Sequence, residues 1–176
     1  FLDLYAGAGG IGIEALSRGA AHVTFVDVSK DSLAVIKQNV EQMGFGDRAE
    51  VVLSKAEVFL KKPSVSFNLV FLDPPYADSA GRTTNLYNQD NLDVAHDVRR
   101  WAIANGDNPR YRIVLCGYEG EHDMPGNWRK HAYSASKAYG TANGGGLNAE
   151  NRHKERLWFS PACLRVRPTL FEEAMP

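Results

Sequence analysis

Short apolar segments alternate with longer segments of helical periodicity along most of the chain. Strands are expected where apolar, β-branched and aromatic residues run together, and helices where apolar residues recur every three or four positions. The predicted strands cover residues 1–5, 22–27, 49–53, 67–72 and 111–116, and the predicted helices cover 11–18, 30–42, a short segment ending at 60, and 92–104. Ser29 is a suitable cap for the second helix, and Gly44 a suitable end.

The last third of the chain has a different pattern. Residues 131–134 and 156–159 predict two more strands, separated by a long stretch rich in glycine and asparagine. Strand–helix alternation is typical of a parallel sheet with helices on both faces, and the final pair predicts an antiparallel hairpin at the sheet edge. We therefore expect an α/β fold with a mostly parallel seven-stranded sheet, formed as a single domain over residues 1–176.

Composition narrows the class of protein. The 176 residues are 44% hydrophobic, with a net charge of −1, as expected for a globular domain. Apolar runs are far shorter than the roughly 20 residues that span a bilayer, and we expect a cytoplasmic monomer with no membrane partner. Two cysteines, Cys116 and Cys163, support neither a disulfide framework nor a metal cluster, and both are expected to be buried thiols. Because the chain begins without methionine on a predicted core strand, we expect an upstream segment to be missing.

Charge is distributed unevenly along the second half. Residues 73–123 contain nine acids and five Lys/Arg, whereas residues 128–167 contain eight Lys/Arg and two acids. The later segment is the candidate surface for a polyanion, and an ordinary solvated face is the alternative.

A glycine-rich loop follows the first predicted strand. Gly7, Gly9 and Gly12 fit the pattern G-x-G-x-x-G, and Asp27 stands 20 residues beyond Gly7. This pattern is compatible with NAD and with S-adenosylmethionine (SAM), because both offer a ribose diol to an acid at the end of the second strand. Asp3 favours SAM, since a carboxylate suits the ammonium of a methionine moiety and suits a pyrophosphate poorly.

The fourth predicted strand ends in Asp73-Pro74-Pro75-Tyr76, a sequence that cannot continue a sheet. Methylation of an exocyclic base amine requires the nitrogen lone pair to be aligned with the methyl group. Asp73 offers a carboxylate to the amine, Pro74 offers a carbonyl on a backbone stiffened by Pro75, and Tyr76 offers a face for an unstacked base. A simple proline turn with Tyr76 in the core is the structural alternative.

The chain resembles two families of SAM-dependent methyltransferases. Residues 1–77, with DLYAGAGGIGIEALSRGA, FVD and FLDPPYA, are similar to bacterial 16S rRNA guanine-N2 methyltransferases. Residues 73–165, with DPPYADSAGRT, IVLCGYEGEH and ERLWFSPACL, are similar to phage-type DNA adenine methylases. Both resemblances imply a Rossmann-like class I methyltransferase, with a SAM-binding half over 1–72, a catalytic and substrate-facing half over 73–167 and a tail over 168–176. A natural mosaic, a fragment and a fusion all remain open.

The resemblance also assigns residues to the site, without a metal. Catalytic roles fall on Asp73, Pro74, Pro75 and Tyr76, and cofactor binding falls on Asp3, Tyr5, Ala6, Gly7, Gly9, Asp27 and Val28. One departure stands out. Where the rRNA family usually has an acid near the cofactor adenine, this chain has Ser54-Lys55-Ala56.

Substrate contacts are expected from residues that follow the catalytic motif. The candidates are polar or aromatic and lie near predicted strand ends or the glycine-rich stretch: Arg82, Tyr118, Lys137, Tyr139, Arg152 and Lys154. For His122, a structural role is favoured over catalysis. Adenine N6 in DNA is the first predicted target, and guanine N2 in 16S rRNA is the second. A binding module without turnover and an NAD-linked oxidoreductase are further alternatives.

Overall fold

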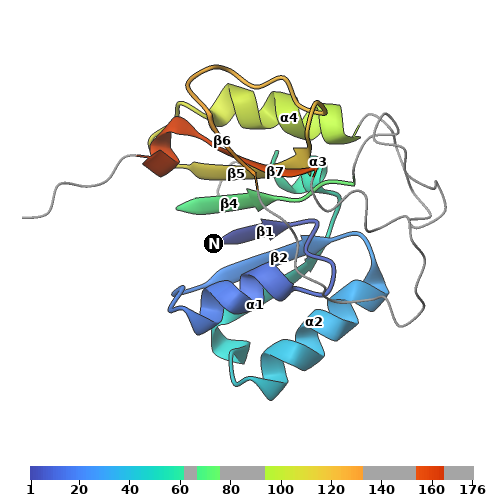
Figure 1. The fold of residues 1–176 in the computed structure, drawn as a ribbon. Helices are drawn as coiled ribbons and strands as arrows, with labels where there is room; N and C mark the ends of the chain where they lie inside the picture. Colours follow the sequence, from blue (N-terminus) through green and yellow to red (C-terminus); the bar gives the residue numbers. More distant parts are fainter. Residues whose placement is uncertain (62–66, 76–93, 133–153, 165–176) are drawn as a thin grey trace, which may run out of the picture.

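The computed structural model describes residues 1–61, 67–75, 94–132 and 154–164, and these ranges form a sheet with helices packed against it (Figure 1). The strand order is β3-β2-β1-β4-β5-β7-β6. The strands are β1 (Leu2–Leu4), β2 (Val23–Asp27), β3 (Ala49–Leu53), β4 (Leu69–Leu72), β5 (Arg112–Tyr118), β6 (Arg129–Ala132) and β7 (Glu155–Phe159).

Strands β1 to β5 are parallel, while β7 is antiparallel to both β5 and β6. The predicted seven-stranded, mostly parallel sheet with an antiparallel C-terminal pair is therefore confirmed. The structure adds that β7 inserts between β5 and β6. Consequently the first residue of β7 lies at the same edge of the sheet as the last residues of the parallel strands.

Four α-helices occur in the described ranges: α1 (Gly10–Ser17), α2 (Lys30–Gln42), α3 (Ala56–Phe59) and α4 (Val94–Asn105). Ser29 caps α2 as predicted, because its Oγ accepts a hydrogen bond from the Ser32 N–H at 3.2 Å. Gly44 follows that helix with φ of 71°, a left-handed conformation that favours glycine. None of the described helices combines the length and the apolar character needed to cross a membrane.

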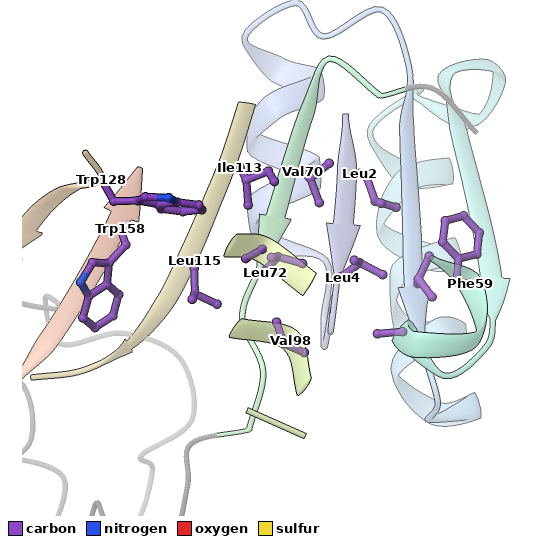
Figure 2. Close-up of a cluster of buried hydrophobic side chains, with 13 residues drawn as sticks. Leu2, Leu4, Phe59, Val70, Leu72, Val98, Ile113, Leu115, Trp128 and Trp158 are labelled. Carbon is purple, nitrogen blue, oxygen red and sulfur yellow. The ribbon is translucent and has the colours of Figure 1, made fainter. Parts of the chain in front are cut away.

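Two hydrophobic clusters hold the helices to opposite faces of the sheet. Leu2, Leu4, Val26, Leu72 and Leu115 belong to the cluster shown in part in Figure 2, which packs against α3 and α4. The second cluster lies under α1 and α2 and is built from Leu16, Val23, Phe25, Leu33, Ile36 and Val40. Because side chains alternate along a strand, residues next to the first set point toward the α1/α2 face. This alternation determines where the polar residues at the strand ends lie.

Element boundaries differ from the sequence prediction mainly in the last third. Strand β5 continues to Tyr118, two residues beyond the predicted end, because Gly117 and Tyr118 pair with Arg156 and Glu155 of β7. Strand β6 begins at Arg129, two residues earlier than predicted. All four of its side chains are exposed, so no apolar alternation marks it in the sequence.

Both cysteines are free thiols. Cys116 is buried, as predicted, and Cys163 is only partly buried. Cys163 lies close to the buried Ser160, whose hydroxyl accepts a hydrogen bond from the Ile113 N–H at 3.0 Å.

Candidate active site

The carboxyl ends of β1, β2 and β4 meet at one edge of the sheet, and each strand has an aspartate within it, at its end or directly after it. Asp3 lies between Leu2 and Leu4, and its residue is 2% exposed. Its Oδ2 accepts a hydrogen bond from the Gly12 N–H, at the start of α1, over 2.9 Å. This bond connects the end of the first strand directly to the helix behind the glycine loop.

Asp27, the last residue of β2, holds the other end of the same loop. Its Oδ2 accepts a hydrogen bond from the Gly7 N–H at 2.9 Å, and its Oδ1 accepts one from the Ser29 N–H at 2.8 Å. Each carboxylate oxygen has a second lone pair, so the group can still accept hydrogen bonds from a ligand diol. The next residue, Val28, is 49% exposed and offers an apolar surface beside the carboxylate.

The backbone between these aspartates turns sharply. Tyr5 has φ of 63°, which is unusual for a residue with a side chain, and Gly7 and Gly9 also have positive φ. The N–H groups of Tyr5 and Ala6 both donate to the Val26 carbonyl, at 3.0 and 3.2 Å. A Cβ at Gly7 would meet no atom within 4 Å, so the loop has open space on that side. The predicted cofactor residues are therefore all in the described structure and share one edge.

Glycines in the loop also allow close packing. A Cβ on Gly12 would lie 2.2 Å from a ring carbon of Phe25, and a Cβ on Gly9 would lie 2.9 Å from Ile36. These two positions bring α1 and the loop against the sheet.

Asp73 directly follows β4 and continues the backbone pairing of that strand with β1 for one more residue. Its N–H points to the Leu4 carbonyl at 3.4 Å. Desolvation, followed by the nearby carboxylates of Glu155 and Glu121, raises the pKa of Asp73 to about 6. The Asp73 residue as a whole is exposed to solvent. Pro74 is buried and Pro75 is partly buried, whereas Tyr76 lies outside the described residues.

The aspartates at this edge influence one another. Burial is the main cause that raises the pKa of Asp3 to about 7; the Gly12 hydrogen bond opposes it, and the charges of Asp73 and Asp27 add to it. The edge thus concentrates negative charge, with no group of metal-binding residues among the described ranges. Such a site suits a cationic ligand.

The last residue of β5 and the first residue of β7 form the other side of this edge. Tyr118 is the last residue of β5, and its N–H donates to Oε2 of Glu121 at 2.8 Å. Lys154 is exposed just before β7. Of the predicted substrate residues, the structure brings these two to the edge. The other four, Arg82, Lys137, Tyr139 and Arg152, lie outside the described residues.

Sequence reasoning missed Glu155. This residue pairs with Tyr118, and its charge is among the causes that raise the pKa of Asp73. Its position depends on the insertion of β7 between β5 and β6. The residue patterns of β6 and β7 do not predict that strand order.

His122 is buried, as a structural role requires. Its Nε2 lies 3.2 Å from the Cys116 carbonyl, and its ring packs edge-on against Trp158 with centroids 5.1 Å apart. Desolvation lowers the pKa of His122, so the neutral ring is favoured.

The positions where the resemblance to the rRNA family predicts an acid are occupied by Ser54, Lys55 and Ala56. The Ser54 Oγ donates to the Lys55 carbonyl at 3.0 Å, and the Lys55 residue is exposed. A carboxylate contact to a cofactor adenine is therefore missing from these positions.

Comparison with known proteins gives a consistent picture. A family model described as conserved hypothetical protein 95 matches residues 1–96. The putative rRNA methyltransferase YlbH of Bacillus subtilis is 42% identical over 80 residues, covering 44% of this chain and 44% of that protein. Ribosomal RNA small subunit methyltransferase D of Escherichia coli K12 is 30% identical over 130 residues, covering 74% of this chain and 60% of that protein. The chain thus spans about half the length of these curated relatives.

Solved structures agree on the fold. The putative methyltransferase yhhF from Escherichia coli has a TM-score of 0.58 at 27% identity, covering 92% of this chain and 75% of that chain. The N-terminal domain of human METTL16, solved in complex with S-adenosylhomocysteine (SAH), has a TM-score of 0.60 at 14% identity, covering 91% and 60%. The predicted Rossmann-like methyltransferase fold is confirmed.

Proposed function

Because the chain belongs to the conserved hypothetical protein 95 family, we propose that it is a SAM-dependent methyltransferase that acts on ribosomal RNA, with the exocyclic N2 amine of a guanine as its target. One observation supports this most strongly. Asp3, Asp27 and Asp73, which are widely separated in the sequence, interact at one edge of the sheet, beside a glycine loop with open space. Ligands of open α/β sheets bind at this edge.

The residues present suit SAM. Asp27 would hold the ribose hydroxyls, as it already orients the loop through the Gly7 N–H. Asp3, when ionised, would pair with the ammonium of the methionine moiety, and Val28 would contact the adenine. NAD fits less well, because its pyrophosphate would lie near the Asp3 carboxylate.

When bound, SAM supplies an electrophilic methyl group. The chain's own contribution is to position the acceptor amine and to receive its proton. The Asp73 carboxylate would accept one hydrogen bond from the amine, and the Pro74 carbonyl would accept another. After transfer the amine nitrogen is positive and loses a proton. An aspartate with a pKa near 6 can take up that proton and release it to water.

The choice of nucleic acid follows from the relatives. Both curated relatives are named for rRNA methylation. This supports the rRNA guanine alternative over adenine in DNA, which the second half of the sequence had placed first. DNA adenine therefore becomes the second candidate, supported by the resemblance of residues 73–165 alone.

A labelled methyl group on SAM tests the proposal. Purified protein is offered 30S particles, free 16S rRNA and unmethylated duplex DNA in separate reactions, followed by nucleoside analysis. N2-methylguanosine in rRNA is expected. N6-methyladenine in DNA would overturn the choice of acceptor, and SAM binding without transfer to any acceptor would support the binding-module alternative. A protein that does not bind SAM would overturn the proposal as a whole.

A further inference from the structure

Glu155 reaches the active-site edge from the far end of the chain. It is the first residue of β7, and it pairs with Tyr118, the last residue of β5. Since β7 is antiparallel to β5, its first residue lies where the parallel strands end. Residue 155 is thereby brought to the same edge as residue 73.

Alternation places both carboxylates on the same face of the sheet. Leu72, Leu115 and Trp158 belong to the cluster on the α3/α4 face. Asp73 follows Leu72, and Glu155 precedes Trp158 by three positions, so both point toward the α1/α2 face. Cys116, which follows Leu115, shares that face.

Electrostatic interactions agree with this placement. Glu155 is the largest charge effect on Asp73, after desolvation. Burial and then the carboxylates of Asp73, Glu155 and Asp3 raise the pKa of the Cys116 thiol well above its usual value. The three carboxylates therefore all lie close enough to the buried Cys116 thiol to disfavour its ionisation.

These carboxylates have no cationic partner in the part of the chain that the structure describes. No Lys, Arg or His nitrogen in those ranges forms a salt bridge with Asp73 or Glu155. Glu119, one residue beyond Tyr118, shows the opposite situation. Lys130 at 2.6 Å and Arg156 both bind its carboxylate. Among the described residues, the local cations thus pair with Glu119 and none pairs with Glu155.

We propose that Glu155, acting with Asp73, makes the site selective for positive charge, so that it holds the SAM sulfonium in preference to the uncharged sulfide of SAH. This inference rests on the proposed function. Methyl transfer breaks the bond between sulfur and the methyl carbon, and sulfur keeps the electron pair. The positive charge moves to the acceptor nitrogen and leaves as a proton. The ammonium and carboxylate of the methionine moiety are common to both molecules, which differ only in the methyl group on sulfur and in the positive charge that it brings.

The selectivity is the dissociation constant of SAH divided by that of SAM, both measured by calorimetry, so a larger ratio means a stronger preference for SAM. The interaction of two nearby unit charges in a water-exposed site corresponds to roughly a fivefold effect on binding. Glu155→Gln is expected to weaken SAM binding by about that factor and to leave SAH binding unchanged. Glu155→Asp keeps the charge and is expected to keep the ratio. Glu41→Gln, an exposed residue of α2, makes the same change in net charge far from the edge and should also keep it.

Each result of these binding measurements either supports or overturns the proposed role of Glu155. A lower ratio in Glu155→Gln alone supports the inference. An equal loss of SAM and SAH binding would overturn it, because that result indicates a structural role for Glu155. An unchanged ratio would overturn it as well, while the proposed function stands if the wild-type chain still methylates rRNA. Thermal unfolding of each variant shows whether β7 remains in place.

Discussion

The carboxylates on the two sides of the active-site edge differ in the hydrogen bonds that they accept from the backbone. On the cofactor side, Asp3 and Asp27 accept hydrogen bonds from the backbone N–H groups of Gly12, Gly7 and Ser29, at 2.8 to 2.9 Å. On the amine side, within the described ranges, the carboxyl groups of Asp73 and Glu155 accept none. The first pair is oriented before any ligand arrives, whereas the second pair remains available to one.

On the proposed function, this difference separates the residues that bind the cofactor from those that assist methyl transfer. Carboxylates that are fixed by the backbone present a rigid surface to a cofactor, and rigid contacts preserve affinity. Carboxylates without protein partners keep their full capacity for an incoming amine or cation. Substitutions on the two sides should therefore affect different measured quantities.

Asp73→Ala should have the largest effect. Loss of the acceptor that aligns the amine is expected to lower kcat about a hundredfold. SAM affinity should change only a few-fold, because the glycine loop is untouched. Rapid-quench methyl transfer and calorimetry measure the two quantities. A variant with normal kcat would remove Asp73 from the catalytic role.

Asp27→Ala, on the cofactor side, should affect SAM affinity rather than kcat. Removing a charged acceptor and releasing the Gly7 N–H is expected to weaken SAM binding by roughly 1.5–3 kcal/mol, or about ten- to a hundredfold. At saturating SAM, kcat should stay within a few-fold of wild type. Calorimetry with SAM, beside Asp31→Ala as an exposed control, tests this. A fall in kcat at unchanged affinity would contradict the assignment.

Gly12→Ala should reduce stability rather than binding chemistry. Its Cβ would lie 2.2 Å from the Phe25 ring, and the resulting overpacking is expected to cost about 1–3 kcal/mol of the free energy of unfolding. Gly10→Ala is a matched control on the same helix, because a Cβ there meets no atom within 4 Å. Urea titration of both variants gives the comparison. Equal stabilities would mean that helix α1 is not as close to the sheet as described.

The smallest effect should be a slope of stability with pH. The folded-state pKa of Asp3, about 7, is above its unfolded value of about 3.9, so the folded protein binds this proton more tightly. The contribution of Asp3 to the stability of the ligand-free protein should therefore be complete below about pH 3.9, fall as the pH rises, and be lost above about pH 7. Melting temperatures across pH 5 to 8 should decline by a few degrees. Asp3→Asn should flatten that slope, and an unchanged slope would show that Asp3 ionises freely.

Much of the fold could be predicted because the pattern is local. Apolar runs at β1 to β5 and a capped amphipathic α2 follow from neighbouring residues, and parallel order then brings the strand ends together. That reasoning located Asp3, Asp27 and Asp73 correctly at one edge. It was sufficient for the cofactor side, whose predicted residues lie within the first 28 positions and belong to one β-α-β unit.

The amine side depends on contacts between distant segments, and the sequence patterns do not contain them. β6 has four exposed side chains and so lacks the alternation that marks a half-buried strand. The insertion of β7 is set by its pairing with both β5 and β6. Without that strand order, Glu155 could not be distinguished from an ordinary surface acid.

The pairing of β7 also has a consequence for which parts of the chain can vary in length and sequence. Its register with β5 on one side and β6 on the other fixes Glu155, whatever the length of the connection between Ala132 and Glu155. That connection contains Lys137, Tyr139 and Arg152, which we expect to contact nucleic acid. On the proposed function, insertions or substitutions there can therefore change the preferred acceptor over evolutionary time without displacing the carboxylates of Asp73 and Glu155. A library of connections grafted at these two residues would be a practical route to enzymes with new targets.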